Sequence, residues 1–308
     1  MHVISIDQFS QAQLKQIFDQ ADEFQKQLAN KDSRLKLSQK HAGKQVCTLF
    51  YEPSTRTRLS FEAAAQNLGM GVVSTESAGQ FSSAAKGETI EDTMNVLNQY
   101  GFDAIIIRHS ETGAVKKAAN VSKTPVVNAG DGKGEHPTQA LLDAFTIRKE
   151  FERLDNLKVV IGGDLANGRT AKSLAKLLSL YPNNHLVFVS IAELRITQDI
   201  KDLLKRSGTS YEETSDLDKA LTNADVVYWT RLQKERLANP EDFDSAGFNL
   251  TKKSIQSLPK TAIIMHPLPR VDEIAVEIDD DPRAKYFQQA GNGLYIRMAL
   301  LDKIASQN

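Results

Sequence analysis

The run Ser54-Thr55-Arg56-Thr57-Arg58 places three hydroxyl groups and two guanidinium groups within five residues, and these are donors that bind a phosphate. The apolar residues 45–50 before it predict a buried strand, and apolar positions at helical spacing from Phe61 to Leu68 predict a helix after it. A strand that turns directly into a helix directs free N–H groups and the positive end of the helix dipole at one place. The sequence therefore predicts an anion site there, with Ser54 or Thr55 as the helix cap. The alternative is a capped helix whose arginines are solvated or paired with nearby glutamates.

Arginine or histidine also follows several other predicted strands. These residues are Arg108, His136, Arg169, Arg231 and the run His266-Pro267-Leu268-Pro269-Arg270. In open α/β sheets, ligands bind beyond the carboxyl ends of the strands. Each residue alone has a simpler explanation: a solvated or ion-paired loop residue, a helix cap at His136, or a rigid structural turn at His266. Together they predict one anion-binding cleft between two domains.

Strand and helix patterns alternate in two successive runs along the 308 residues, a length that exceeds one ordinary core. The predicted strands are 45–50, 72–73, 104–107, 125–128, 159–161, 186–189, 226–229 and 262–265. The predicted helices are 7–30, the segment after 54, 88–100, 137–151, 169–181, 198–207, 216–223 and 292–306. Residues 31–44 are predicted to form a loop, and 74–86 a mobile surface loop.

This alternation predicts an α/β fold with two open, mostly parallel, doubly wound domains joined by bridging helices. The first domain is expected at 1–136, with a C-terminal helix of about 290–308 returning to it. The second is expected at 151–289, with residues 137–150 as a bridging helix.

Composition narrows the class of protein. A net charge of −1 gives no general attraction to nucleic acid or acidic membranes, so any anion site must be local. Cys47 is the only cysteine, which excludes a disulfide within the chain and a thiolate zinc site. The N-terminus lacks a signal pattern, and no stretch approaches the roughly 18 apolar residues of a membrane span. We therefore expect a cytoplasmic protein that binds neither nucleic acid nor membrane.

Two cofactor-binding patterns are missing from the chain. The glycine-rich segment 162–168 does not fit G-x-G-x-x-G, and no G-x-x-x-x-G-K-[S/T] occurs. The six histidines form no close metal-binding pair. We therefore expect no cofactor and no metal, and interpret 162–168 as a glycine turn that delivers Arg169.

The order and approximate spacing of these motifs resemble the aspartate/ornithine carbamoyltransferase family, from about residue 5 to the C-terminus. The motifs are S-T-R-T-R at 54–58, Arg108, H-P-T-Q at 136–139, G-R-T at 168–170, R-L-Q-K-E at 231–235 and H-P-L-P-R at 266–270. The ornithine enzymes typically carry His-Cys-Leu-Pro late in the chain, so the resemblance favours aspartate. It implies transfer of a carbamoyl group from carbamoyl phosphate to L-aspartate, an early step of de novo pyrimidine biosynthesis.

The resemblance also implies a role for each site residue. The carbamoyl-phosphate residues are Ser54, Thr55, Arg56, Thr57, Ser82, Lys86, Arg108, His136, Gln139, Leu268 and Pro269, and the aspartate residues are Lys86, Arg169, Arg231 and Gln233. The implied catalytic residues are Arg56, Thr57, Lys86, Arg108 and His136, of which Thr57, Arg108 and His136 stabilise the tetrahedral oxyanion. Gln139 and the carbonyls of Leu268 and Pro269 accept hydrogen bonds from the carbamoyl NH₂.

Residues 82–89 resemble the family loop that reaches into a neighbouring subunit, which implies a homotrimer with shared active sites. Ala85 stands where some relatives carry a basic residue, and a separate regulatory chain stays open. Two alternatives are a carbamoyltransferase for another amino acid such as ornithine, and a non-catalytic assembly subunit. The second would be expected to lose Arg56, Lys86, Arg108 or His136, all of which are present. A nucleotide-binding oxidoreductase is disfavoured by the missing glycine fingerprint.

Overall fold

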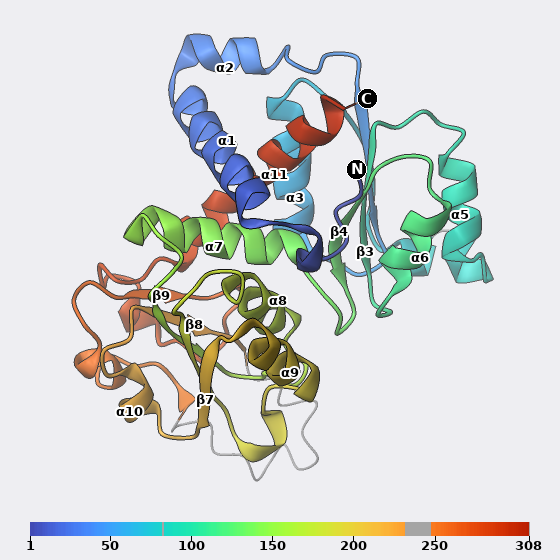
Figure 1. The fold of residues 1–308 in the computed structure, drawn as a ribbon. Helices are drawn as coiled ribbons and strands as arrows, with labels where there is room; N and C mark the ends of the chain where they lie inside the picture. Colours follow the sequence, from blue (N-terminus) through green and yellow to red (C-terminus); the bar gives the residue numbers. More distant parts are fainter. Residues whose placement is uncertain (82, 232–247, 308) are drawn as a thin grey trace. The chain divides into compact units, whose positions relative to one another are not determined.

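The computed structural model describes residues 1–81, 83–231 and 248–307 (Figure 1). The chain forms two compact units, one of residues 1–141 with 291–308 and the other of residues 142–290. The boundaries fall inside two helices, α7 (Pro137–Phe151) and α11 (Tyr286–Ala305), so each of these helices contributes to both units.

The first unit contains a parallel four-stranded sheet in the order β2-β1-β3-β4. Its strands are β1 (Gln45–Phe50), β2 (Gly71–Thr75), β3 (Ala104–His109) and β4 (Val126–Asp131). Its helices are η1 (Ile6–Gln8), α1 (Gln11–Ala29), α2 (Lys31–Leu37), α3 (Thr55–Asn67), α4 (Ala78–Phe81), η2 (Ser83–Lys86), α5 (Ile90–Leu97) and α6 (Ala114–Val121). Helices α5 and α6 cover one face of the sheet, and α1, α3 and the end of α11 cover the other (Figure 1).

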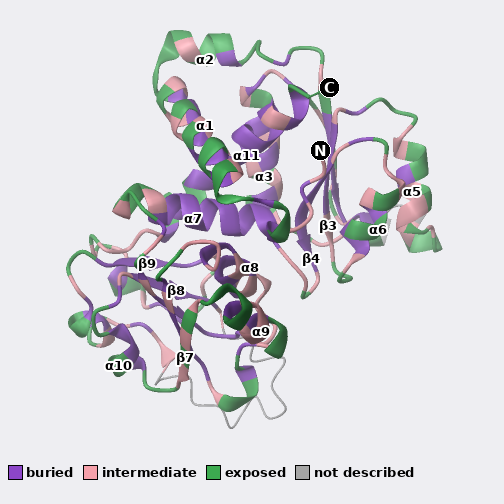
Figure 2. Cartoon of the chain, viewed as in Figure 1, coloured by how far each residue is buried: buried purple, intermediate pink, exposed green. Residues whose placement is uncertain are grey.

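The apolar face predicted after residue 54 is buried as expected. Phe61, Ala64, Ala65 and Leu68 are each 0% exposed. Residue Arg297 of α11 places its guanidinium 5.0 Å from the centre of the Phe61 ring, which ties the end of the chain to α3. Figure 2 shows β3 and β4 mainly buried and α2 largely exposed.

The second unit contains a parallel five-stranded sheet in the order β7-β6-β5-β8-β9. Its strands are β5 (Lys158–Gly162), β6 (His185–Val189), β7 (Ser210–Thr214), β8 (Val226–Trp229) and β9 (Ile263–Met265). Its helices include α8 (Arg169–Leu178), η3 (Ala192–Leu194), α9 (Gln198–Ser207), α10 (Leu217–Leu221), η7 (Ser254–Ser257) and η8 (Val276–Ile278). Helices α8 and α9 lie on one face (Figure 1), and α10 and η7 pack on the other against Val160, Val187 and Trp229.

The predicted α/β class with two parallel, helix-flanked sheets is confirmed. The loop predicted at 31–44 is wrong in its first half, where α2 forms because Asn30 caps two N–H groups and Leu37 is buried. The loop predicted at 74–86 contains the short helices α4 and η2, anchored by the buried Ala78. The sequence analysis also missed α6 and the edge strand β7, and α11 begins six residues earlier than predicted.

A close contact between β5 and β8 generates a test of the second core. A Cβ atom on Gly162 would lie 2.0 Å from the buried Trp229 ring. We expect Gly162→Ala to lower the free energy of unfolding by about 1–3 kcal/mol, because the ring must move within a packed core. Urea unfolding followed by circular dichroism measures the change.

Gly291→Ala is the matched control, because a Cβ atom there meets nothing within 4 Å in the exposed part of α11. This change should be neutral or stabilising by up to about 1 kcal/mol. Equal unfolding midpoints for the two variants would contradict the proposed steric conflict.

Candidate active site

The predicted anion site occupies the turn from β1 into α3. Ser54 stands at the N-cap of α3, but its side chain makes no capping hydrogen bond. The prediction that Ser54 or Thr55 caps the helix is therefore right in position and wrong in bonding. Thr57 is 7% exposed within the first turn, whereas Arg56 lies at the surface. The Ser54 side chain therefore does not cap the first N–H groups of α3. Its hydroxyl and these N–H groups can donate hydrogen bonds to an anion.

Arg58 does not belong to the anion-binding group. Its guanidinium donates to Glu62 Oε1 (3.4 Å), Ser74 Oγ (3.1 Å) and Glu76 Oε2 (2.8 Å). For Arg58 the alternative interpretation is correct, because the side chain serves to join α3 to the end of β2.

Arg108 is brought next to the anion site by strand register. It pairs with Phe50 across β1 and β3, and Tyr51 N–H donates to its carbonyl (2.9 Å). Its Nε atom lies 2.9 Å from Glu52 Oε2. A guanidinium has five N–H donors, and the ion pair with Glu52 is made at Nε. Glu52 therefore orients Arg108 beside the turn that carries Ser54.

His136 and Gln139 begin α7, directly after the turn that follows β4. Asp131 shapes this turn by accepting from Glu135 N–H (2.8 Å) and Gly113 N–H (3.0 Å). The His136 carbonyl accepts from Gln139 N–H (3.0 Å), so the backbone of His136 closes the first turn of α7. Both side chains are buried, at 3% and 8% exposure. Because β1, β3 and β4 are neighbours and parallel, the Ser54 turn, Arg108 and His136 lie at one edge of the first sheet.

Lys86 ends η2 and is exposed. Ser82, predicted to bind carbamoyl phosphate, lies outside the described residues. These two residues belong to the segment 82–89, for which the family resemblance implies a reach into the site of a neighbouring subunit.

Arg169 and Arg231 follow two neighbouring strands of the second sheet. The glycine turn delivers Arg169 as the first residue of α8, and Asp164 holds the turn by accepting from Asn167 N–H (2.9 Å). Position 163 requires a glycine, because its φ is +108° and a Cβ atom would lie 2.2 Å from the carbonyl oxygen of Thr230. Arg231 follows β8, which pairs with β5, and Gln233 lies outside the described residues.

The turn after β9 is held by His266. Leu268 N–H donates to His266 Nδ1 (2.8 Å), and His266 Nε2 lies 2.7 Å from Glu273 Oε1. The bond between Leu268 and Pro269 is cis, and Leu268 has a φ of +52°. His266 is 1% exposed, so the structural interpretation of this histidine is correct. The carbonyls of Leu268 and Pro269 remain the groups of this turn that could face a ligand.

The glutamate beside His266 has a shifted acidity. Burial alone would raise the pKa of Glu273, but hydrogen bonds from His266 and from backbone N–H groups outweigh it and lower the pKa. Arg270, at the end of the same run, pairs with Asp279 through Nη2 and Oδ2 (2.6 Å) and donates to the Tyr286 hydroxyl (3.1 Å). Arg270 thus supports the turn rather than a ligand.

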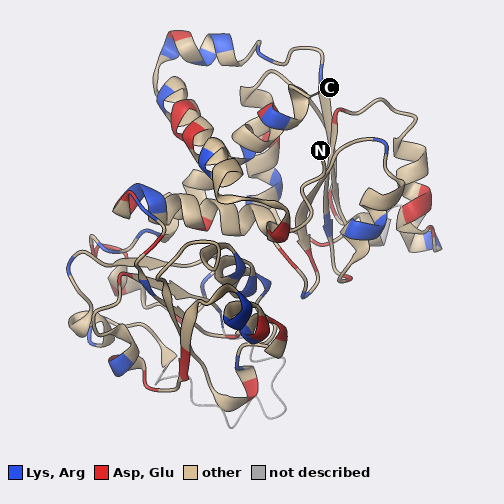
Figure 3. Ribbon diagram, in the orientation of Figure 1, with Lys and Arg blue, Asp and Glu red and all other residues tan. Residues whose placement is uncertain are grey.

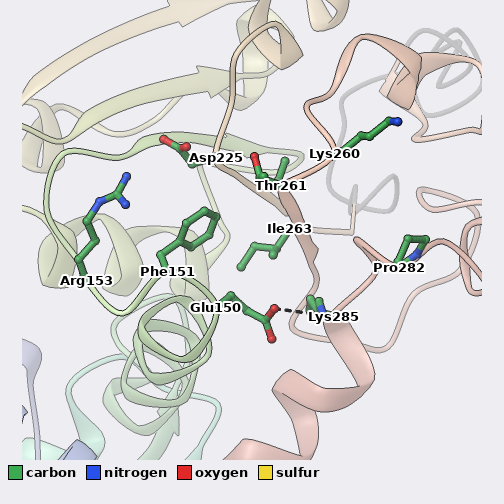
Figure 4. Close-up of a pocket in the computed structure, with 10 residues that line it drawn as sticks. Glu150, Phe151, Arg153, Asp225, Lys260, Thr261, Ile263, Pro282 and Lys285 are labelled. Carbon is green, nitrogen blue, oxygen red and sulfur yellow. Dashed lines mark ion pairs between the residues drawn. The ribbon is translucent and has the colours of Figure 1, made fainter.

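A pocket of about 610 Å³ lies at the opposite, amino end of the second sheet (Figure 4). Asp225 and Ile263 in its lining stand at the starts of β8 and β9, and Glu150 pairs across it with Lys285 (3.1 Å). None of the predicted site residues is among the residues that line it. This pocket is therefore separate from the strand ends that carry Arg169, Arg231 and the His266 turn.

Acidic and basic residues are interspersed over the helices of both units (Figure 3). In the described ranges, no group of three or more His, Cys, Asp or Glu residues could hold a metal ion. Across the same ranges, no helix has the length and apolar character to cross a membrane.

Comparison with known proteins identifies two matching domains. A family model described as the carbamoyl-P binding domain of aspartate/ornithine carbamoyltransferase matches residues 1–149, and one described as the Asp/Orn binding domain matches residues 155–304. The chloroplastic aspartate carbamoyltransferase of Oryza sativa subsp. japonica is 50% identical over 303 residues, which is 97% of this chain and 83% of that protein. The aspartate carbamoyltransferase catalytic subunit of Methanocaldococcus jannaschii is 43% identical over 309 residues, covering 100% of this chain and 98% of the other.

Solved structures agree with these matches. The catalytic subunit of M. jannaschii aspartate transcarbamoylase has a TM-score of 0.90 at 42% identity and covers 100% of this chain and 98% of its own. Aspartate transcarbamoylase from Trypanosoma cruzi, in complex with carbamoyl phosphate and aspartate, has a TM-score of 0.89 at 35% identity and covers 97% and 94% of the two chains.

The Glu273 contacts generate a pH-dependent prediction. The folded pKa of Glu273 is lower than its unfolded pKa, so its contribution to stability is present above the unfolded pKa, near 4.5, and is lost as pH falls through the folded value. We expect Glu273→Gln to lower the free energy of unfolding at pH 7 by about 1–3 kcal/mol. The gap to the parent protein should shrink below about pH 4.5.

Urea unfolding at several pH values measures this gap. Glu193→Gln, at an exposed position in η3, is the control and should track the parent at every pH. A stability gap for Glu273→Gln that persists unchanged to pH 3 would show that the carboxylate charge contributes nothing.

Proposed function

The chain belongs to the aspartate/ornithine carbamoyltransferase family, and from this premise we propose that it transfers the carbamoyl group of carbamoyl phosphate to L-aspartate. The products are N-carbamoyl-L-aspartate and phosphate. The observation that carries the proposal is the arrangement at the carboxyl ends of the strands of the first sheet. The N-terminus of α3, which has no side-chain cap from Ser54, lies there with Arg108 and His136. Aspartate is favoured over ornithine by relatives at 43–50% identity that are named for aspartate.

The phosphate of carbamoyl phosphate is held by residues of the first unit. The N–H groups and hydroxyls of Ser54, Thr55 and Thr57, with the guanidinium of Arg56, bind the phosphate. Arg108 spans the phosphate and the carbonyl oxygen. Gln139 and the carbonyls of Leu268 and Pro269 accept from the carbamoyl NH₂, which distinguishes this substrate from free phosphate.

Aspartate is held by the cations of the second unit. Arg169 takes the α-carboxylate, and Arg231, with Gln233, takes the side-chain carboxylate. The two substrates are both anions and repel each other, so each must be matched by cations before their reacting atoms can approach.

The reaction needs positioning more than acid–base chemistry. The aspartate nitrogen forms a bond to the carbamoyl carbon, and the bond from that carbon to the bridging phosphate oxygen breaks. Thr57, Arg108 and His136 stabilise the oxyanion that forms on the carbonyl oxygen. The departing phosphate accepts the proton that leaves the amine, which agrees with the lack of a dedicated general base among the assigned residues.

The proposed assembly is a homotrimer in which Lys86 and Ser82 of one subunit complete the site of the next. Support comes from Lys86, which is exposed at the end of η2. A lysine in this position can take part in the reaction only if it reaches an anionic substrate. A separate regulatory chain is compatible with relatives that are named catalytic subunits. A reducing compartment such as the cytoplasm suits the single buried thiol, Cys47.

Substrate choice gives the first test. The parent enzyme should carbamoylate aspartate and not ornithine. Arg231→Ala should lower kcat/KM for aspartate about 10- to 150-fold, because a charge-assisted hydrogen bond of about 1.5–3 kcal/mol is lost. Arg195→Ala, an exposed arginine of the same unit, is the control and should leave kcat/KM unchanged. Equal turnover of ornithine and aspartate by the parent would refute the assignment.

Mixed oligomers test the shared site. Arg56→Ala and Lys86→Ala should each be nearly inactive alone. Dissociated and reassembled together, they should regain part of the activity, because a closed ring of both variants has an interface where an intact Arg56 meets an intact Lys86. Each variant reassembled with itself is the control. Mixed oligomers that form and stay inactive would place each complete site within one chain.

A further inference from the structure

Four polar side chains form a buried hydrogen-bonded relay in the second unit. Asp143, His266, Glu273 and Gln289 are each at most 1% exposed. Gln289 Nε2–H donates to Asp143 Oδ1 (2.6 Å), and the backbone N–H of His266 donates to Gln289 Oε1 (2.8 Å). The imidazole Nε2 of His266 lies 2.7 Å from Glu273 Oε1. The relay thus joins α7, the first turn of α11 and the turn after β9.

The hydrogen bonds show which nitrogen of the His266 ring is the donor and which is the acceptor. Because Nδ1 accepts from Leu268 N–H, the ring proton of the neutral imidazole is on Nε2, which donates to Glu273. The second oxygen of Glu273 accepts from the N–H groups of Val271 (3.1 Å) and Asp272 (3.2 Å). The turn is therefore held on both sides of the Leu268 and Pro269 carbonyls.

Stability alone does not explain this arrangement. Burying carboxylates and amides costs more than burying apolar groups of the same volume, even when the polar groups are hydrogen-bonded. His266 and Glu273 make the hydrogen bonds within the turn itself. Gln289 and Asp143 add a connection from the turn to α7, where Asp143 lies one helical turn after Gln139.

We propose that Asp143 and Gln289 are positioning residues that act through His266 to set the backbone carbonyls of Leu268 and Pro269. This inference rests on the proposed function, in which those carbonyls and Gln139 accept from the carbamoyl NH₂. The relay ends on α7, where Asp143 lies one helical turn from Gln139, the other acceptor assigned to that NH₂ group. Its loss weakens recognition of the carbamoyl group and not of the phosphate.

The test compares carbamoyl phosphate with inorganic phosphate. Gln289→Met keeps the length of the side chain and removes its donor and acceptor. Equilibrium binding to the full-length enzyme should show the dissociation constant of carbamoyl phosphate rising about tenfold, since about one hydrogen bond to the NH₂ group is lost. The dissociation constant of inorganic phosphate should change by less than about twofold, because phosphate does not use the turn.

Two controls separate positioning from general destabilisation. Gln288→Met changes the exposed neighbour on the same helix and should bind both ligands as the parent does. Val187→Ala weakens the core of the same unit from β6, outside the elements that carry the relay, and should lower the melting temperature while the ratio of the two dissociation constants stays constant.

A double exchange tests the direction of the hydrogen bond. In the double variant Asp143→Asn with Gln289→Glu, the amide of residue 143 is the donor and the carboxylate of residue 289 is the acceptor. The hydrogen bond between the two positions is thus restored in the reverse direction. The double variant should recover most of the preference for carbamoyl phosphate that Gln289→Glu alone loses, because a glutamate at position 289 has no donor to face Asp143. If Gln289→Met does not fold, Asp143→Leu, which has a similar volume and removes the acceptor for Gln289 Nε2–H, carries the same binding comparison.

The outcomes distinguish this inference from the proposed function. If the parent shows no preference for carbamoyl phosphate over phosphate, the proposed function is wrong and the relay has no such task. If the parent shows the preference and folded relay variants keep it, only the positioning role is overturned.

Discussion

Each sheet of this protein is fully parallel, so every loop that follows a strand begins at the same side of its sheet, where the carboxyl ends of the strands lie. The candidate site depends on that constraint, because its residues are scattered over more than 200 positions of the sequence. In the first unit the neighbouring strands β1, β3 and β4 bring the Ser54 turn, Arg108 and His136 to one edge. In the second unit β5, β8 and β9 do the same for Arg169, Arg231 and the His266 turn.

The arginines at these edges have different tasks, which are decided by their local partners. Arg56 and Arg58 are two residues apart on α3, so their side chains leave the helix about 160° apart around its axis and meet different surroundings. Arg58 meets Glu62 and Glu76, while Arg56 lies at the surface. Arg270 is likewise committed to Asp279 and Tyr286. A cluster of basic residues in a sequence therefore overstates the number of cations that can face an anion.

The sequence predicted the parts of the fold that local pattern determines. Buried apolar strands and the apolar face from Phe61 to Leu68 belong to this group. The edge strand β7 was missed because its Ser-Tyr-Glu-Glu-Thr sequence lacks a continuous apolar run, and it is a strand because it pairs with β6. Helix α2 was missed because its polar sequence is helical through the Asn30 cap and one buried leucine, Leu37.

The candidate site could be predicted only as far as strand ends and residue types allow. The placement of Arg108 and Arg169 directly after strands can be read from the sequence. The pairing of Arg58 with Glu76 and of His266 with Glu273 cannot, because each depends on how a loop returns to its starting point. Asp143 and Gln289 give no sequence signal at all, since they are 146 residues apart and neither belongs to a motif.

Rigidity around the candidate site follows from the chemistry proposed for it. Phosphate is a good leaving group, so the rate depends chiefly on how well two anions and an oxyanion are held, and errors in placement are costly. Three of the described loops at these edges are accordingly fixed by a buried or sterically constrained group. Asp131 shapes the turn before His136, Gly163 permits the backbone contact before Arg169, and Glu273 holds the His266 turn. The fold thus supplies through fixed backbone geometry what other enzymes obtain from a reactive side chain.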